Sequence, residues 1–257
     1  MRKNGVSHKI LDLFQAGKKS VALLIDPEKI GDASSLRQLI LTGIDNQLGF
    51  FFVGGSLGSP KKTHHCVSFI KGLSQGIPVV LFPGNALQWT ENSDALLFLS
   101  LISGRNPEFL IGQHVSIAPY LATTNIEVLP TGYMLVDSGG ITSVNYISQT
   151  LPLPNDKPDL AIATALAGVF LGLKYLFLDA GSGANHPVSP ELIAGVKKNA
   201  HCPLLVGGGI DTANKAQSAW EAGADIIVLG NGVEKNPGLL METLNMANSH
   251  NLSLNVN

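Results

Sequence analysis

The sequence is poor in cysteine, and its histidines are not spaced for metal binding. Two cysteines, Cys66 and Cys202, are too few for the disulfide framework of a small secreted domain or for a closed zinc site, so ordinary packing is expected of both. No two histidines have an HxxxH or comparable spacing. Surface or loop roles are therefore expected of these histidines: His64, His65, His114, His186 and His201.

Charge is also scarce, at 14% of residues, and the formal net charge is -2. The basic residues form no stripe that could neutralise phosphates in series, which argues against a nucleic-acid partner. The adjacent lysines Lys18 and Lys19, and likewise Lys61 and Lys62, are isolated pairs typical of a solvated surface.

Long hydrophobic runs are absent. The most apolar tract, residues 160–173, is interrupted by Thr164, Gly168 and Gly172 and is shorter than the roughly 20 residues of a membrane span. It predicts a buried helix whose small residues face a neighbour. Residues 1–20 lack the apolar core of a signal peptide and predict a short amphipathic helix. A cytoplasmic protein without a membrane span is therefore expected, with peripheral membrane contact left open.

Hydrophobic residues, in contrast, make up 45% of the chain. Such a surplus favours an apolar substrate groove, an oligomer interface, or both. The 257 residues match the roughly 250 that are typical of one (β/α)8 barrel. No linker or low-complexity stretch suggests a second domain, so residues 1–257 are expected to form one domain.

Short apolar runs alternate with helical stretches along the chain, which is typical of a parallel sheet. Eight runs that each end in polar or glycine-rich residues predict an α/β fold, a TIM-type (β/α)8 barrel, with an open doubly wound sheet as the alternative. The segment 151–159 is expected to be an extended loop, because its three prolines cannot continue a helix. The expected strands lie within residues 21–25, 50–53, 78–82, 95–102, 126–136, 174–178, 204–206 and 226–229.

The last two predicted strands each run into a turn without bulky side chains. These turns are Gly207, Gly208 and Gly209 after one strand, and Gly230 and Asn231 after the other. Backbone amides in such turns can approach an anion closely. The loops after the last two strands of a (β/α)8 barrel frequently bind a phosphate, which predicts a phosphate site here. Asp211 or Thr212 is expected to cap the intervening helix.

Asp26 and Ser56 follow two neighbouring predicted strands. Pro27 biases Asp26 towards an extended conformation that points it off the end of its strand. A carboxylate and a hydroxyl in these places suggest one Mg²⁺ held by few protein ligands, with substrate phosphates completing its coordination. The alternative for Asp26 is an N-cap of the next helix.

Asp179 ends another predicted strand, in the sequence LDAGSG beside the phosphate turns. It could orient or deprotonate a hydroxyl of a bound phosphate ester, while Gly181, Ser182 and Gly183 contact the same anion. A tight turn with a capping serine is the alternative. Lys174 lies at the start of its strand, the wrong end for a Schiff base, which disfavours a lysine-dependent aldolase.

Eight motifs carry a resemblance to a known family, and they span nearly the whole chain. They are LLIDPEK (23–29), FVGGS (52–56), FPGN (82–85), NPEFLIGQH (106–114), GYMLVDSGGITSVNYIS (132–148), LDAGSGA (178–184), VGGGI (206–210) and LGNGVEK (229–235). In order and spacing the chain resembles the geranylgeranylglyceryl phosphate synthase family, and most of all its larger group, shared by archaea and some bacteria.

The resemblance implies a Mg²⁺-dependent prenyltransferase on a modified barrel. It would join sn-glycerol 1-phosphate to an allylic polyprenyl diphosphate, with geranylgeranyl diphosphate as the expected donor, in an ether linkage and release diphosphate. Asp26 and Ser56 take the metal positions. The glycerol 1-phosphate positions are Phe177, Leu178, Asp179, Ala180, Gly181, Ser182, Gly183, Gly208, Gly209, Gly230 and Asn231.

The chain departs from the family motif at two of these positions. Phe177 stands where a tyrosine is usual, so a hydroxyl contact is lost, and Asp179 stands where glutamate is frequent, which keeps the charge but shortens the reach. The apolar tail of the donor needs a groove. Trp89, Phe98, Tyr120 and Tyr133 are its candidate residues, with ordinary core packing as the alternative.

Two other functions remain open from the residues alone. A phosphosugar isomerase or lyase could use the same phosphate turns without a metal at Asp26, and a non-catalytic phosphate-binding barrel would be consistent with the departure at Phe177. The apolar surplus and the resemblance both favour a homo-oligomer, with a hexamer as the candidate state.

Overall fold

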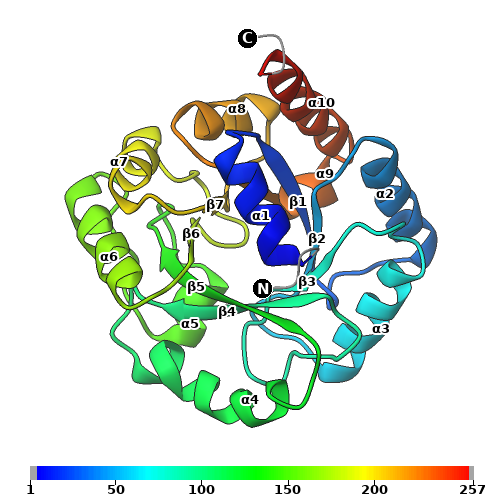
Figure 1. Ribbon diagram of the computed structural model, residues 1–257, viewed down its shortest axis with the longest axis horizontal. Helices are drawn as coiled ribbons and strands as arrows, with labels where there is room; N and C mark the ends of the chain where they lie inside the picture. Colours follow the sequence, from blue (N-terminus) through cyan, green and yellow to red (C-terminus); the bar gives the residue numbers. More distant parts are fainter. Residues whose placement is uncertain (1–4, 255–257) are drawn as a thin grey trace.

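Eight short apolar strands pair in chain order and close into a parallel barrel, as the computed structural model of the chain shows for residues 5–254 (Figure 1). The ring closes where Ala22 of the first strand pairs with Val228 of the last. The TIM-type barrel is confirmed, and the open sheet is wrong. The strands are β1 (Ser20–Ile25), β2 (Phe50–Val53), β3 (Val79–Leu81), β4 (Ala95–Leu101), β5 (Glu127–Leu135), β6 (Tyr175–Asp179), β7 (Leu204–Gly207) and β8 (Ile226–Leu229).

Helices surround this ring (Figure 1). Several begin where a polar side chain accepts hydrogen bonds from the first turn: Asp32 caps α2, and Thr212, rather than Asp211, caps α8. The helices are α1 (Val6–Gln15), α2 (Ala33–Asp45), α3 (Pro60–Lys71), the π-helical turn η1 (Glu108–Gly112) that continues into α4 (Gln113–Leu121), α5 (Ser143–Ser148), α6 (Pro158–Phe170), α7 (Pro190–Ala200), α8 (Ala213–Glu221), α9 (Asn231–Lys235) and α10 (Gly238–Ser253).

The strands are buried on both faces, so alternate side chains enter two different cores. In β6, Tyr175 and Phe177 point into the inner core of the barrel. Leu176 and Leu178, between and after them, belong to the outer core that packs against the helices. This alternation decides which residues at the end of a strand can face a ligand.

Helix α1 covers the end of the barrel at which the strands begin, and Figure 1 shows it across the centre of the ring. Val6 and Ile10 join the inner core. Glu127, the first residue of β5, accepts hydrogen bonds from the amides of Val6 and Ser7 at 2.6 and 3.2 Å. The Ser7 hydroxyl lies 2.6 Å from that of Tyr175. The opposite end of the barrel, where the strands finish, is left for the site.

The connection from β3 to β4 departs from the usual strand and helix alternation. Residues 82–94, all of which the structure describes, contain no helix. The barrel is therefore modified at this point, as the resemblance implies, and the irregular loop forms one wall of a pocket described below.

Two expectations about residues 151–173 need correction. The loop ends two residues earlier than expected, because Pro158 occupies the first turn of α6, where its missing N–H costs nothing. Helix α6 buries Ala161, Ala165 and Gly168, but its far end exposes apolar side chains, with Phe170 82% exposed. It is therefore buried on one face only.

Within residues 5–254, no helix combines the length and apolar character needed to cross a bilayer.

Candidate active site

A polar pocket of about 610 Å³ lies at the carboxyl ends of the strands. It brings together residues that are up to about 200 positions apart in the sequence, because parallel strands of a barrel finish on the same face. The predicted site residues that line it are Asp26, Ser56, Phe177, Asp179, Gly181, Ser182, Gly183, Gly208, Gly209, Gly230 and Asn231.

Leu178 and Ala180 are the two predicted site residues that do not line this pocket. Both side chains belong to the outer core, on the side of the barrel that faces the helices. The cause is the two-residue alternation of strand β6, which continues into Ala180. A side-chain contact of either residue with a ligand in this pocket is excluded by that orientation.

Asp179 is only 7% exposed, and both its carboxylate oxygens are hydrogen bonded. Oδ1 accepts from the amide of Gly181 at 2.8 Å, and Oδ2 accepts from the hydroxyl of Tyr133 at 2.6 Å. Burial raises the pKa of this carboxyl group, while the bonds from Tyr133 and Gly181 oppose the rise. A carboxylate with a raised pKa in a pocket is a suitable proton acceptor.

The turns after β6 and β7 pack backbone against backbone. Gly208 has a φ of +78°, and a Cβ atom there would lie 2.6 Å from the amide nitrogen of Gly181 and 2.7 Å from Oδ1 of Asp179. Only glycine fits this position. Helix α9 begins directly after Gly230, and this short extra helix after β8 is a frequent part of phosphate sites in barrels.

Asp26 is held by its own turn, since Oδ1 accepts a hydrogen bond from the amide of Glu28 at 3.0 Å. The N-cap alternative is wrong, because Asp32 caps α2. The Asp26 side chain is 18% exposed and approaches β2 so closely that a Cβ on Gly55 would lie 2.8 Å from Oδ2. Ser56 follows at once and lines the same pocket.

The carboxylate of Asp26 and the hydroxyl of Ser56 are oxygen donors of the kind that a hard cation such as Mg²⁺ prefers. In the described part of the chain, no group of three or more histidine, cysteine or acidic side chains could hold a metal ion. A cation at Asp26 and Ser56 would therefore need most of its ligands from a substrate or water. This donor set is the one expected when phosphate oxygens complete the coordination.

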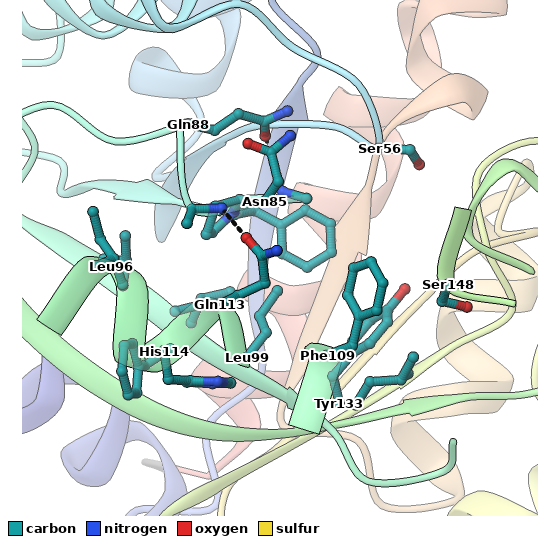
Figure 2. Close-up of a pocket in the computed structure, with 18 of the residues that line it drawn as sticks. Ser56, Asn85, Gln88, Leu96, Leu99, Phe109, Gln113, His114, Tyr133 and Ser148 are labelled. Carbon is teal, nitrogen blue, oxygen red and sulfur yellow. Dashed lines mark hydrogen bonds between the residues drawn. The ribbon is translucent and has the colours of Figure 1, made fainter. Parts of the chain in front are cut away.

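A second pocket, of about 110 Å³, adjoins the first and is mainly apolar (Figure 2). The two pockets share Gly55, Ser56, Phe82 and Val144. The walls come from the loop after β3, from β4 and β5, from η1 with α4, and from α5. Figure 2 shows Gln113 of α4 turned towards that loop, where its Oε1 accepts a hydrogen bond from the amide of Ala86 at 2.6 Å.

Three of the four expected groove residues, Trp89, Phe98 and Tyr133, line this apolar pocket. Tyr120 does not line it: its side chain is 58% exposed, and its ring centroid lies 6.0 Å from that of Trp89. His114 is also part of the wall, which corrects the surface role expected of it. Its buried ring packs edge-on against Phe98 at 4.3 Å, and burial lowers its pKa.

Three aromatic rings meet at the boundary between the pockets. Phe82 lies 5.3 Å from Phe177 and 6.0 Å from Tyr133, and the last two are 5.7 Å apart, measured between ring centroids. Phe82 lines both pockets, Phe177 the polar one and Tyr133 the apolar one. Phe82 and Tyr133 lie within the motifs and Phe177 directly precedes one, but nothing in their spacing indicates that the rings touch.

Lys29 is a further residue that the sequence reasoning missed. It lines the polar pocket, and its ammonium group reaches Asn231 and Ser182 across the mouth of the barrel. The available signal was the motif DPEK, which places a lysine three residues after Asp26.

Comparison with known proteins assigns the chain to one family over most of its length. Residues 15–248 match the PcrB family. The chain is 50% identical over 243 residues to a geranylgeranylglyceryl phosphate synthase of Spirosoma linguale, covering 95% of this chain and 97% of that protein. It is 37% identical to the protein of the same name from Metallosphaera sedula, with 91% and 92% covered.

A solved structure is also similar over most of its length. It is (S)-3-O-geranylgeranylglyceryl phosphate synthase from Thermoplasma acidophilum in complex with the substrate sn-glycerol-1-phosphate. The TM-score is 0.85 at 28% sequence identity, with 92% of this chain and 96% of that chain covered.

Proposed function

Because the chain belongs to the PcrB family, we propose that it is a prenyltransferase of the geranylgeranylglyceryl phosphate synthase type. It joins sn-glycerol 1-phosphate to an allylic polyprenyl diphosphate, with geranylgeranyl diphosphate as the expected donor. An ether bond forms and diphosphate is released.

The observation that carries this proposal is the junction of the two pockets. One pocket has glycine turns suited to an anionic group and side-chain oxygens suited to a cation, and the other is an apolar space suited to a hydrocarbon chain. They meet at Gly55, Ser56 and Phe82. A phosphosugar isomerase or lyase has no use for the apolar pocket, so the junction favours the prenyltransferase.

In this proposal the acceptor phosphate lies against Gly208, Gly209, Gly230 and Asn231, as their position at the ends of β7 and β8 supports. A glycerol hydroxyl then points towards Asp179. The hydroxyl of Tyr133 and the amide of Gly181 fix the direction of that carboxylate. The diphosphate of the donor lies near Asp26 and Ser56, with its hydrocarbon tail in the apolar pocket.

Asp26 and Ser56 would hold Mg²⁺ together with diphosphate oxygens. The bound ion would neutralise the charge that develops on diphosphate as it leaves. The close approach of Asp26 to Gly55 supports this placement, because it directs the carboxylate to the edge shared by the two pockets.

The chemical step exchanges one carbon–oxygen bond for another. The glycerol oxygen bonds to the allylic carbon, and the bond from this carbon to the diphosphate oxygen breaks with its electron pair. The hydroxyl proton passes to Asp179. Positive charge develops on the allylic carbon, and the faces and edges of Phe82, Tyr133 and Phe177 surround the boundary where this carbon would lie.

Product analysis tests the function directly. The protein is incubated with Mg²⁺ and geranylgeranyl diphosphate, with either sn-glycerol 1-phosphate or its 3-phosphate enantiomer, and products are identified by mass spectrometry. The expected result is a prenylated glycerol phosphate from the 1-phosphate, in greater yield than from the 3-phosphate. No product from either acceptor, with shorter and longer donors also tried, would refute the proposal.

A homo-oligomer and a cytoplasmic location are also proposed. Exposed apolar side chains at Phe170 and Leu171 support the first, since contact with another subunit would remove them from water. Light scattering in solution and fractionation of cells test the two proposals. A monomer at micromolar concentration would contradict the oligomer.

A further inference from the structure

The polar pocket has more negative than positive side chains, although it is proposed to bind two anionic substrates. Its lining contains two lysines, Lys29 and Lys235, against five carboxylates. The carboxylates belong to Asp26, Glu28, Asp179, Asp211 and Glu234. Each cation in this pocket therefore matters for the binding of phosphate groups.

Lys29 connects the turns that follow three different strands. Its Nζ donates to Oδ1 of Asn231 at 3.0 Å and to Oγ of Ser182 at 3.3 Å, and it lies 3.7 Å from Oδ2 of Asp26. Ser182 in turn donates to Asn231 at 3.2 Å. The ammonium group thus lies between the residues predicted to hold a metal and the residues predicted to hold the acceptor phosphate.

The backbone that carries Lys29 is held in place on both sides. The Lys29 amide donates to the carbonyl of Asp26 at 3.0 Å. The neighbouring Glu28 accepts a hydrogen bond from the amide of Ser59 at 3.0 Å and pairs with Lys62, which ties the turn to the start of α3. The Lys29 side chain itself is 42% exposed, so a ligand can reach its ammonium group.

We propose that Lys29 is a phosphate-binding residue of the acceptor site, in direct contact with the phosphate of glycerol 1-phosphate. The inference rests on the proposed function and adds to it a residue from the turn after β1, the strand that pairs with β8. A phosphate held by Ser182 and Asn231 lies within reach of the lysine, because the lysine already contacts both residues. Their neutral oxygens are weaker partners for an ammonium group than a phosphate oxygen is.

Calorimetric titration without any metal tests the contact. sn-Glycerol 1-phosphate and inorganic phosphate are titrated into the wild type, Lys29→Met and Lys29→Arg. Losing a charge-assisted bond should weaken binding of both ligands by about 10- to 100-fold in Lys29→Met. Arginine keeps the charge and should restore most of the affinity. In steady-state assays, the KM for glycerol 1-phosphate should rise more than the KM for the donor.

Lys235→Met is the matched control, because it removes the other lysine of the same pocket. It should weaken phosphate binding much less than Lys29→Met. Equal losses of phosphate affinity in the two variants would show that the lysines act through the general electrostatic field of the pocket. That result would overturn the inference of a direct contact. Wild-type affinity in Lys29→Met, or a loss that arginine does not restore, would overturn it as well.

These results are independent of whether the proposed reaction takes place. If the wild type binds phosphate but makes no prenylated product, the proposed function fails. The phosphate affinity of Lys29→Met relative to that of the wild type still decides the role of Lys29. If the wild type binds neither glycerol 1-phosphate nor inorganic phosphate, both the acceptor site and the role of Lys29 are refuted.

Discussion

The hydroxyl of Tyr133 lies 2.6 Å from Oδ2 of Asp179 and donates a hydrogen bond to it inside the barrel. Tyr133 of β5 is the register partner of Phe177 in β6. The phenol that is absent at position 177 is thus present on the neighbouring strand. Burial and the nearby carboxylate raise the pKa of Tyr133, so it remains a donor across the physiological pH range.

Tyr133→Phe should shift the acidic limb of the kcat/KM profile to higher pH. The bond from Tyr133 lowers the pKa of Asp179, so its removal raises that pKa, and the ionised form that accepts a proton is lost at a higher pH. Tyr175→Phe is the control, because it removes a buried hydroxyl bond at the other end of the barrel. An unshifted profile in Tyr133→Phe would contradict the role of Asp179 as proton acceptor.

Asp179→Asn should separate activity from stability. The pKa of Asp179 is raised in the folded protein, so its contribution to stability is present below the unfolded-state pKa and is lost as pH rises through the folded-state pKa. The variant should therefore unfold at a higher temperature than the wild type at neutral pH, while kcat falls by about 100-fold or more. Thermal unfolding of both proteins, measured from pH 4 to pH 8, checks whether the variant gains stability relative to the wild type as the pH rises. A variant that is less stable across this range would contradict it.

Gly55→Ala should impair the predicted metal site without unfolding the protein. The new Cβ would lie 2.8 Å from the Asp26 carboxylate and displace it. The Mg²⁺ concentration for half-maximal activity should rise by about 10- to 100-fold, as is typical when a ligand loses its orientation. Gly31→Ala is the control in the connection that carries Asp26, since a Cβ there meets nothing within 4 Å. If Gly55→Ala needs the same Mg²⁺ concentration for half-maximal activity as the wild type, this result would argue against Asp26 as a ligand.

Phe82→Leu should slow the chemical step more than it weakens substrate binding. Leucine keeps an apolar side chain but removes the ring at the junction of the pockets, and a desolvated cation–π contact is worth about 2 kcal/mol, or about 30-fold in rate. Single-turnover kinetics measure this step directly. Phe52→Leu alters a buried ring that lines neither pocket, so it should affect stability and leave the single-turnover rate unchanged. Equal rates in Phe82→Leu and the wild type would exclude a role for the ring.

The regular part of the structure could be predicted from the sequence. The apolar runs have clear ends, and parallel strands of a barrel must finish on one face, so Asp26, Ser56 and Asp179 could be placed in one pocket before any side chain was seen. The orientation of the Leu178 side chain towards the outer core does not follow from a motif taken as one continuous block, because alternate residues of a strand face opposite sides.

The irregular part was harder to predict, for two physical reasons. The loop of residues 82–94 has no period, so nothing in the sequence indicated that Phe82 would face Phe177 or that Gln88 would be buried in a pocket wall. A side chain such as Lys29 can reach in several directions, and its partners come from strands that are more than 150 residues away. For Pro158, the same residue that cannot continue a helix is well suited to begin one.

The position of α1 also constrains the order in which the chain can fold. This helix is the first element of the described chain, yet its partners Glu127 and Tyr175 lie 121 and 168 residues further on. Loop-closure entropy delays contacts of such long range until intervening structure exists. Helix α1 must therefore wait until β5 and β6 have been synthesised and paired, and its docking over the end of the barrel is a late step of folding.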